Sequence, residues 1–202
     1  EYRDNETGMH VIRMSRLSAK LAKKIGLPDE ECQLILQASP MHDVGKIGIP
    51  DEILLKPGKL NEEEWVIMKK HSEIGAEILS GSRSAIMKMA ESIALTHQER
   101  WDGSGYPNSL KGEEIPLAGR IVAICDVFDA LTSKRYYKEA YSIEKSMGII
   151  EQGSGKDFEP RLVEAFKEAL PEMVRIVKEL PDNEPADILK VYRETNTTSS
   201  AQ

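Results

Sequence analysis

Apolar residues recur every three or four positions over most of this chain, the spacing that places them on one face of an α-helix. The first clear run contains Val11, Met14, Leu17 and Leu21, and it stops at the segment 25–28, which reads Ile-Gly-Leu-Pro. Glycine and proline in that order readily end a helix. The pattern therefore predicts an N-terminal helix that ends near residue 25.

A second helix is predicted to begin with Asp29 as its N-cap and to end at Pro40, because proline cannot continue a helix without a kink. The turn-rich stretch 56–59, Lys-Pro-Gly-Lys, separates this helix from the next one. Asn61 and Glu64 have the spacing of a capping box, in which each side chain bonds to the backbone of the other residue. They predict the start of a third helix.

Two longer apolar patterns follow, over residues 86–94 and 117–132. The second is too long without a turn for one strand, so it predicts a core helix. Residues 142–180 predict two or three further helices, interrupted at 153–155 and at Pro171, and show no recognisable chemistry. The fold class expected from these patterns is all-α.

The chain has 202 residues, 40% of them hydrophobic, which supports one buried core. We expect one domain over residues 1–180 and a polar, partly disordered tail over 181–202. No apolar run reaches the roughly 18 residues that a membrane span needs. Cys32 and Cys125 lack metal-type spacing and are expected to be reduced, buried thiols of a cytoplasmic protein. The first residue is Glu1, which suggests a domain of a longer protein.

The formal net charge of −7 limits the binding partners that the chain can have. It argues against a broad basic surface for a nucleic acid polymer, and it disfavours any large anionic ligand unless cations are concentrated locally. A cluster of metal ions would supply such cations.

The four histidines, His10, His42, His71 and His97, give the sequence its clearest chemistry. His42 precedes Asp43, and adjacent imidazole and carboxylate side chains can bind the same divalent metal ion. A single pair of this kind also occurs in ordinary surface turns. A metal site is favoured here because the other histidines lie beside further candidate ligands or in helical patterns.

Each of the other histidines has a purely structural alternative. Glu6 and His10 are four residues apart, so they share a helix face and could either face one metal ion or form a surface pair. His71 falls at the end of the helix predicted after Asn61, where a cation also stabilises the helix carbonyls. His97 falls at the end of the following helix.

Residues 99–107, Glu-Arg-Trp-Asp-Gly-Ser-Gly-Tyr-Pro, predict an ordered loop, since they combine turn formers with two aromatic side chains. Asp126 lies within the long apolar run, and a buried carboxylate is costly without a cation or hydrogen-bond donors nearby. A metal ion would satisfy it. Asp129, Arg135 and Lys138 follow, although the two cations equally fit an exposed helix end.

Taken together, these motifs resemble the HD-GYP domains, a branch of the HD metal-dependent phosphohydrolases that hydrolyse cyclic di-GMP in bacteria. The resemblance covers residues 1–170. In chain order, the matching motifs are Glu6-Thr7-Gly8 with His10, then His42-Asp43-Val44-Gly45-Lys46, then Lys70-His71 with Gly75, then His97 followed by residues 101–107, and finally Asp126 to Leu131.

The resemblance implies an HD-type helical bundle with a metal cluster in its core. The implied metal ligands are Glu6, His10, His42, Asp43, His71, His97 and Asp126. The implied catalytic residues are Asp43 and Lys46. The residues implied to hold the bases and phosphates of the dinucleotide are Tyr106, Asp129, Arg135 and Lys138.

One position departs from the family pattern: the second histidine that usually follows the first in this loop is Gln98. An amide oxygen is a weaker ligand than imidazole for iron or zinc. Either two or three ions are compatible with the remaining ligands, and iron or manganese suits a mixed imidazole and carboxylate set. Two ions about 3.5–4 Å apart can acidify a water molecule for attack on a phosphate ester.

The implied activity is hydrolysis of cyclic di-GMP to the linear dinucleotide pGpG, with GMP as a further product. Two alternatives stay open: a degenerate module that binds a cyclic dinucleotide or a partner protein without turnover, and a hydrolase of another cyclic dinucleotide such as cyclic GMP-AMP. Family members commonly carry an upstream receiver or sensor domain. A homodimer is one oligomeric state open to the chain.

Overall fold

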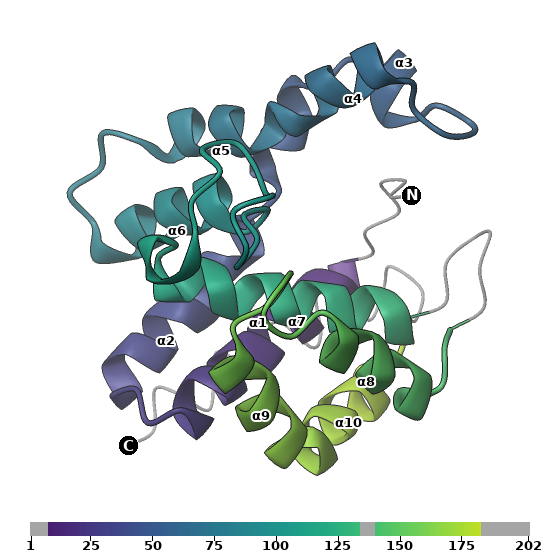
Figure 1. The fold of residues 1–202 in the computed structure, drawn as a ribbon. Helices are drawn as coiled ribbons and strands as arrows, with labels where there is room; N and C mark the ends of the chain where they lie inside the picture. The colour runs from purple at the N-terminus through teal and green to yellow at the C-terminus, as the bar shows by residue number, and fades with distance from the viewer. Residues whose placement is uncertain (1–7, 134–139, 183–202) are drawn as a thin grey trace.

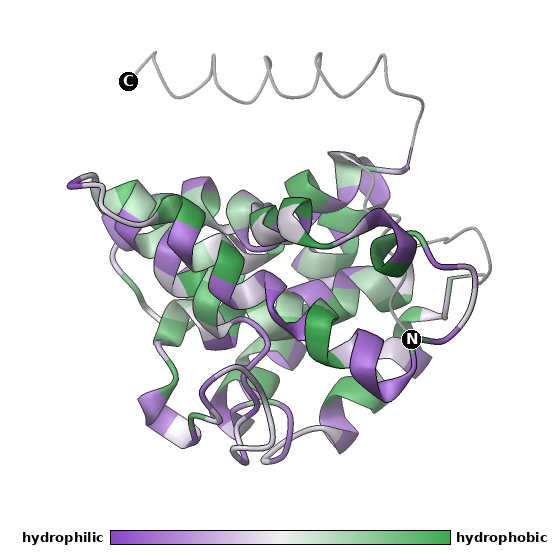
Figure 2. Cartoon of the chain, turned by 90° about the horizontal axis from the view of Figure 1, so that it is seen from above, coloured by the Kyte–Doolittle hydropathy of each residue, from purple (hydrophilic) through white to green (hydrophobic). Residues whose placement is uncertain are grey.

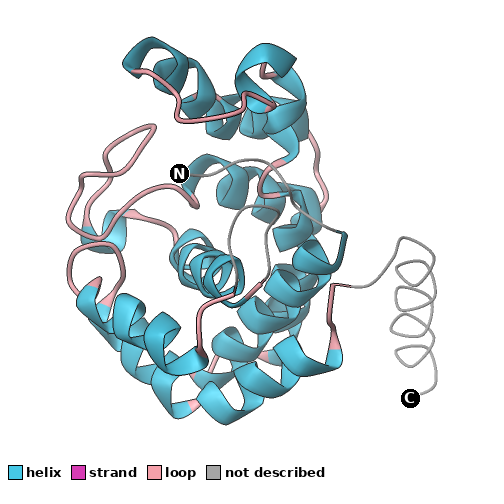
Figure 3. Ribbon diagram, turned by 90° about the vertical axis from the view of Figure 1, so that its right-hand side faces the viewer, coloured by secondary structure: helices cyan, strands magenta, loops and turns pink. Residues whose placement is uncertain are grey.

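The structure, a computed structural model, describes residues 8–133 and 140–182 of the chain. Within these residues the chain forms helices joined by loops and no strand, so the all-α prediction is confirmed (Figure 3). The helices are α1 (Gly8–Lys24), α2 (Asp29–Ala38), η1 (Ser39–Met41), η2 (Val44–Gly48), α3 (Asp51–Leu54), α4 (Glu62–Lys69), α5 (His71–Leu79), α6 (Ala85–Thr96), η3 (Gly112–Glu114), α7 (Leu117–Thr132), α8 (Ile143–Gln152), α9 (Pro160–Glu168) and α10 (Leu170–Glu179).

Helices α1 and α7 pack against each other in the middle of the bundle (Figure 1). The apolar face of α1 presents Met14, Leu17 and Leu21, all with no exposed surface. It also contacts α2, α9 and α10, which cover it from other sides. Hydrophobic and hydrophilic residues alternate around these helices, as amphipathic periodicity requires (Figure 2). Burial of this face fixes the position of α1, and with it that of His10, which is 4% exposed.

A second, smaller apolar cluster contains Ile49, Ile53 and Met68. It joins η2, α3 and α4, which extend to one side of the bundle in Figure 1. The N-terminus of α4 has the predicted capping box: Asn61 Oδ1 accepts from the Glu64 backbone N–H at 2.8 Å, and the Glu64 carboxylate accepts from the Asn61 backbone N–H at 2.8 Å.

Two predicted helix boundaries are wrong. Asp29 is the first residue of α2 rather than its N-cap, which is Pro28 and makes no side-chain cap hydrogen bond. Pro171 does not interrupt a helix, because it lies in the first turn of α10, where a backbone N–H has no helical acceptor anyway. The break between α9 and α10 is at Ala169.

Cys32 and Cys125 are both buried and free of any disulfide, as the sequence predicts. None of the helices in the described part of the chain combines the length and the apolar character that a membrane span requires. The predicted boundary near residue 181 falls at the edge of the described residues and stays a prediction.

Candidate metal centre

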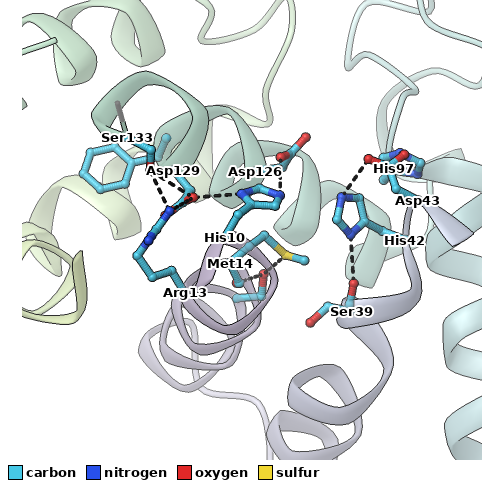
Figure 4. A network of polar contacts seen from close by, with 12 residues as sticks. His10, Arg13, Met14, Ser39, His42, Asp43, His97, Asp126, Asp129 and Ser133 are labelled. Carbon is cyan, nitrogen blue, oxygen red and sulfur yellow. Dashed lines mark hydrogen bonds and ion pairs between the residues drawn. The ribbon is translucent and has the colours of Figure 1, made fainter. Parts of the chain in front are cut away.

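Two groups of candidate metal ligands converge from helices that are far apart in the sequence. The first group contains His10 of α1, His42 just after η1 and Asp126 of α7, with one ligand atom of each lying within 4.8 Å of the others. The Nε2 atom of His10 is 3.5 Å from Asp126 Oδ1. The rings of His10 and His42 meet edge to face, with centroids 5.9 Å apart. In Figure 4 these side chains point toward one another.

The second group contains Asp43, His71 and His97. His71 is the first residue of α5, not the last of the preceding helix, and His97 directly follows α6. The Nε2 atoms of the two histidines are 3.5 Å apart. Asp43 Oδ1 lies 3.2 Å from His71 Nε2 and 3.4 Å from His97 Nε2.

Asp43 connects the two groups. While its Oδ1 faces His71 and His97, its Oδ2 lies 3.1 Å from His42 Nε2, a member of the first group. The same oxygen is 2.8 Å from the Nζ atom of Lys46. One carboxylate therefore contacts ligands of both groups, the arrangement expected of a side chain that bridges two metal ions.

Backbone carbonyls fix the orientation of three of the histidine rings, because each ring donates its Nδ1–H to a carbonyl three residues earlier in the chain. For His42, His71 and His97, the acceptors are Ser39 O at 3.0 Å, Met68 O at 2.8 Å and Ala94 O at 3.0 Å. A carbonyl oxygen only accepts, so the neutral ring carries its proton on Nδ1 and a lone pair on Nε2. Such outer hydrogen bonds are typical of metal-binding histidines.

The inward-facing atoms are consequently electron-pair donors that lie close together. His71 Nε2, His97 Nε2 and Asp43 Oδ1 all lie within 3.5 Å of one another. Lone pairs at such distances repel, and a cation placed among them removes the repulsion. Two imidazole nitrogens and one carboxylate are a common donor set for a divalent metal. The residues of each group therefore fit a divalent ion.

The charge states agree with this assignment. Burial lowers the pKa of His97, so the ring is neutral and can offer its lone pair near pH 7. Burial by itself would raise the pKa of Asp43, but with no ion between the side chains, protons on the Nε2 atoms of His42, His71 and His97 outweigh it and hold the pKa well below its usual value; a divalent cation at the same place acts in the same direction. The carboxylate is ionised.

His10 is oriented by a carboxylate rather than by a carbonyl. Its Nδ1 donates to Asp129 Oδ2 at 2.8 Å. Asp129 in turn accepts from Arg13 Nε at 2.6 Å and from Arg13 Nη2 at 3.0 Å. Burial would raise the pKa of Asp129, but the hydrogen bonds from His10 and Arg13 outweigh it and lower the pKa. Figure 4 shows His10 held between Asp129 and Asp126.

The predicted contact of Asp129 with the substrate is not supported by this geometry and stays a prediction. Asp129 has no exposed surface and no place on the cavity wall, so in this structure it touches His10 and Arg13 instead. Arg13, only 1% exposed, was not identified from the sequence. The available signal was its spacing: Arg13 follows His10 by three residues, which puts both on one face of α1.

Replacing Asp129 with asparagine is expected to lower the affinity for divalent metal by roughly ten- to hundredfold, the scale seen when outer hydrogen-bond partners of ligands are changed. The amide is a weaker acceptor, so it orients His10 less firmly. A metal titration measures the effect. Asp182→Asn is the matched control, since Asp182 accepts from Arg13 at 2.9 Å, whereas Asp129 is the carboxylate that accepts from His10 Nδ1. Equal affinity in the two variants would contradict the role of Asp129.

The loop between α6 and α7 places Tyr106 beside the second group. The carboxylate of Glu99, only 3% exposed, accepts from the backbone N–H groups of Asn108 at 2.8 Å and Leu110 at 3.1 Å. Burial raises the pKa of Glu99. The ring of Tyr106 lies edge to face with His71, at 6.1 Å between centroids. No role for Glu99 is predictable from the sequence, because its spacing does not distinguish a buried carboxylate from a surface one.

A cavity of about 290 Å³ contains ligands of both groups on its wall, namely Asp43, His71, His97 and Asp126. Lys46 and Tyr106 also line it, as their predicted roles require, and so does Gln98.

Asp157 also lines the cavity, although residues 142–180 show no recognisable chemistry in the sequence, and its Oδ1 lies 3.1 Å from Arg100 Nη1. Glu6, Arg135 and Lys138 lie outside the described residues, so their roles stay predictions.

Comparison with known proteins gives consistent results. A model of the HD domain family matches residues 3–162. The 3'3'-cGAMP-specific phosphodiesterase 2 of Vibrio cholerae is 50% identical over 182 residues, which cover 90% of this chain and 35% of the relative. A cyclic di-GMP phosphodiesterase of Thermotoga maritima is 50% identical over 182 residues, which cover 90% of this chain and 48% of that relative. The cyclic di-GMP phosphodiesterase response regulator RpfG of Xanthomonas campestris is 50% identical over 166 residues, which cover 82% of this chain and 44% of RpfG.

Two solved structures share the fold. The cyclic GMP-AMP phosphodiesterase V-cGAP3 of V. cholerae matches with a TM-score of 0.63 and 21% identity, over 89% of this chain and 50% of that chain. Bd1817, an HDG"Y"P protein from Bdellovibrio bacteriovorus, matches with a TM-score of 0.62 and 20% identity, over 84% of this chain and 55% of that chain. The chain thus spans less than half the length of the curated relatives described above.

Proposed function

Because the chain belongs to the HD domain family, in its HD-GYP branch, we propose that it is the catalytic domain of a metal-dependent phosphodiesterase that hydrolyses cyclic di-GMP. The observation that carries the proposal is the position of Asp43, whose two oxygens face ligands of both groups on the wall of one cavity. The expected first product is pGpG, with GMP as a further product.

His10, His42 and Asp126 would hold one divalent ion, and His71 and His97 a second, with Asp43 between them. Mixed imidazole and carboxylate ligands favour iron or manganese. When bound, such ions supply Lewis acidity toward the phosphoryl oxygens and acidify a water molecule at neutral pH. A third ion would require Glu6 or Gln98 as additional ligands.

The chain's own residues contribute binding and charge. Lys46 holds its ammonium 2.8 Å from Asp43 Oδ2 on the cavity wall, where it can offset negative charge that develops on a phosphoryl oxygen. Tyr106 supplies an aromatic contact for a base. Arg135 and Lys138 would bind phosphate oxygens of the dinucleotide. The carbonyl-anchored histidines keep their Nε2 atoms in place through the reaction.

The test is a turnover assay on anaerobically purified protein supplied with ferrous iron or manganese, with products separated by chromatography. Formation of pGpG from cyclic di-GMP supports the proposal. Binding of the dinucleotide without any product would overturn it and favour a binding module. Metal analysis of the same preparation identifies the ion and counts two or three per chain.

A second candidate substrate is 3'3'-cGAMP, since a phosphodiesterase specific for it is as similar in sequence as the cyclic di-GMP enzymes, at 50% identity. The same assay decides between the two when kcat/KM is measured for both dinucleotides. A higher value for 3'3'-cGAMP would reassign the substrate and leave the reaction class unchanged.

The domain is further proposed to act within a longer protein, beside a receiver or sensor domain. RpfG, which is named a response regulator, is 2 to 3 times longer than the part it shares with this chain, because the match covers 44% of it. Comparing the turnover of this domain with that of the full-length protein would reveal any control by the neighbouring part.

Gln98→His tests whether this position reaches the metals. Gln98 is partly buried and lines the cavity, and its backbone carbonyl accepts from the Tyr106 N–H at 3.2 Å. An imidazole there should raise metal affinity by roughly ten- to hundredfold, the change in affinity seen when residues around a metal ion are altered. It should also shift the preference toward softer ions. Activity in excess manganese should change much less. An unchanged metal titration would mean that this side chain does not contact the ions.

A further inference from the structure

The cavity has an aromatic side wall in addition to its metal-binding residues. Trp65 of α4 and Tyr106 of the loop after α6 both line it. Their rings are perpendicular, at 80°, with centroids 6.4 Å apart. Aromatic residues make up only 5% of the chain, and just two of its residues are tryptophans. One of these two therefore stands on the wall of the cavity that holds the candidate metal ligands.

The two rings differ in how many protein side chains already contact them. Tyr106 has His71 against it at 6.1 Å and the Lys69 ammonium over its ring at 5.6 Å, besides Trp65. Trp65 has one ring contact among the described residues, the one with Tyr106. Both side chains are partly exposed, and Trp65 has fewer aromatic and cationic neighbours than Tyr106 to compete with a ligand in the cavity.

Trp65 also packs against the protein on the side of its helix, α4. It is partly buried against the small apolar cluster of Ile49, Ile53 and Met68. Its helix starts at the Asn61–Glu64 capping box. A large, pre-positioned π surface loses little conformational entropy when a ligand stacks on it.

We propose that Trp65 is a stacking platform for one purine base of the substrate, beside the metal centre. This inference rests on the proposed function, since the ligand must carry a base as well as a phosphate. Stacking on an aromatic side chain contributes about 1–3 kcal/mol per base and tolerates every base, because each has a π face. Trp65 therefore contributes affinity for cyclic dinucleotides in general and does not select guanine over adenine.

Tryptophan fluorescence reports this contact directly, because a stacked base quenches the indole. The probe is GMP, which has no phosphodiester to be cleaved, and ribose 5-phosphate is the control without a base. Excitation at the red edge of the tryptophan band avoids absorption by guanine. The protein is loaded with manganese throughout.

Two matched variants show which of the two tryptophans GMP quenches. Trp101→Phe leaves Trp65 as the single tryptophan, and Trp65→Phe leaves Trp101, which lies 5.7 Å from the Arg120 guanidinium and off the cavity wall. GMP should quench the wild type and Trp101→Phe but not Trp65→Phe, and ribose 5-phosphate should quench none. Quenching that persists in Trp65→Phe, or that is missing in Trp101→Phe, would overturn the inference.

A third variant, Trp65→Leu, measures the effect on affinity. It should weaken the binding of GMP and AMP alike by on the order of tenfold, and leave that of ribose 5-phosphate unchanged. Thermal unfolding of the same variant verifies that the small apolar cluster stays folded. A loss confined to GMP would show base selection instead and contradict the platform role.

The outcome separates this inference from the proposed function. If the wild type cleaves cyclic di-GMP but GMP does not quench Trp65, the stacking platform is wrong and the activity stands. If GMP quenches Trp65 and no cyclic dinucleotide is cleaved, the platform stands and the activity is wrong.

Discussion

Replacing Asp43 with asparagine is expected to remove phosphodiesterase activity and at least one bound metal ion. Asp43 contacts His71 and His97 through one oxygen and His42 through the other. The substitution keeps the shape of the side chain but removes the negative charge and one of two ligand oxygens. Activity should fall by on the order of 10³-fold or more, as when a central catalytic group is removed. Product chromatography and metal analysis measure both losses.

The control for this variant is Asp29→Asn, which removes the same charge from an exposed position on α2. Asp29 pairs with Lys23 at 3.1 Å, and both side chains are largely exposed, so little stability depends on the pair. Its activity and metal content should match those of the wild type. Full metal content and activity in Asp43→Asn would show that this carboxylate does not bridge the two groups and would refute the metal-centre assignment.

Features that depend on neighbouring residues were predictable from the sequence. The periodicity of α1 and α7, the capping box of α4 and the adjacency of His42 and Asp43 are all local, so each has a direct signature in the chain. The resemblance to HD-GYP domains added the order of the motifs. Six of the residues it implied as ligands are found in the two groups; the seventh, Glu6, lies outside the described residues.

Features that depend on distant contacts were not predictable. Arg13 and Asp129 are 116 residues apart, and in the sequence Arg13 looks like one more polar residue of an amphipathic helix. For the same reason Asp129 was assigned to the substrate, although it is buried behind His10. Asp157 reaches the cavity only because its segment pairs with the loop after α6, where the Trp101 N–H donates to the Asp157 carbonyl at 3.3 Å. Periodicity carries no information about such pairings.

Gly45 is another residue whose role emerges only from the packing of distant segments. It is buried in η2, two residues after Asp43, against the start of α5. A methyl group at this position would overlap the carbonyl oxygen of His71 and the backbone of Gly75. Backbone atoms cannot move aside as a flexible side chain can. The absence of a side chain therefore lets Asp43 and His71 approach each other.

Gly45→Ala is accordingly expected to separate η2 from α5, lowering the free energy of unfolding by about 1–3 kcal/mol, as overpacking of a tight interior does. Metal affinity should fall as well, because Asp43 and His71 move apart. Gly148→Ala is the matched control: this glycine lies within α8 and a methyl group there meets nothing within 4 Å, so the change should be neutral or slightly stabilising. Thermal unfolding and metal titration of both variants measure the difference. If Gly45→Ala unfolds and binds metal like Gly148→Ala, the close approach of these two segments does not set the geometry of the metal centre.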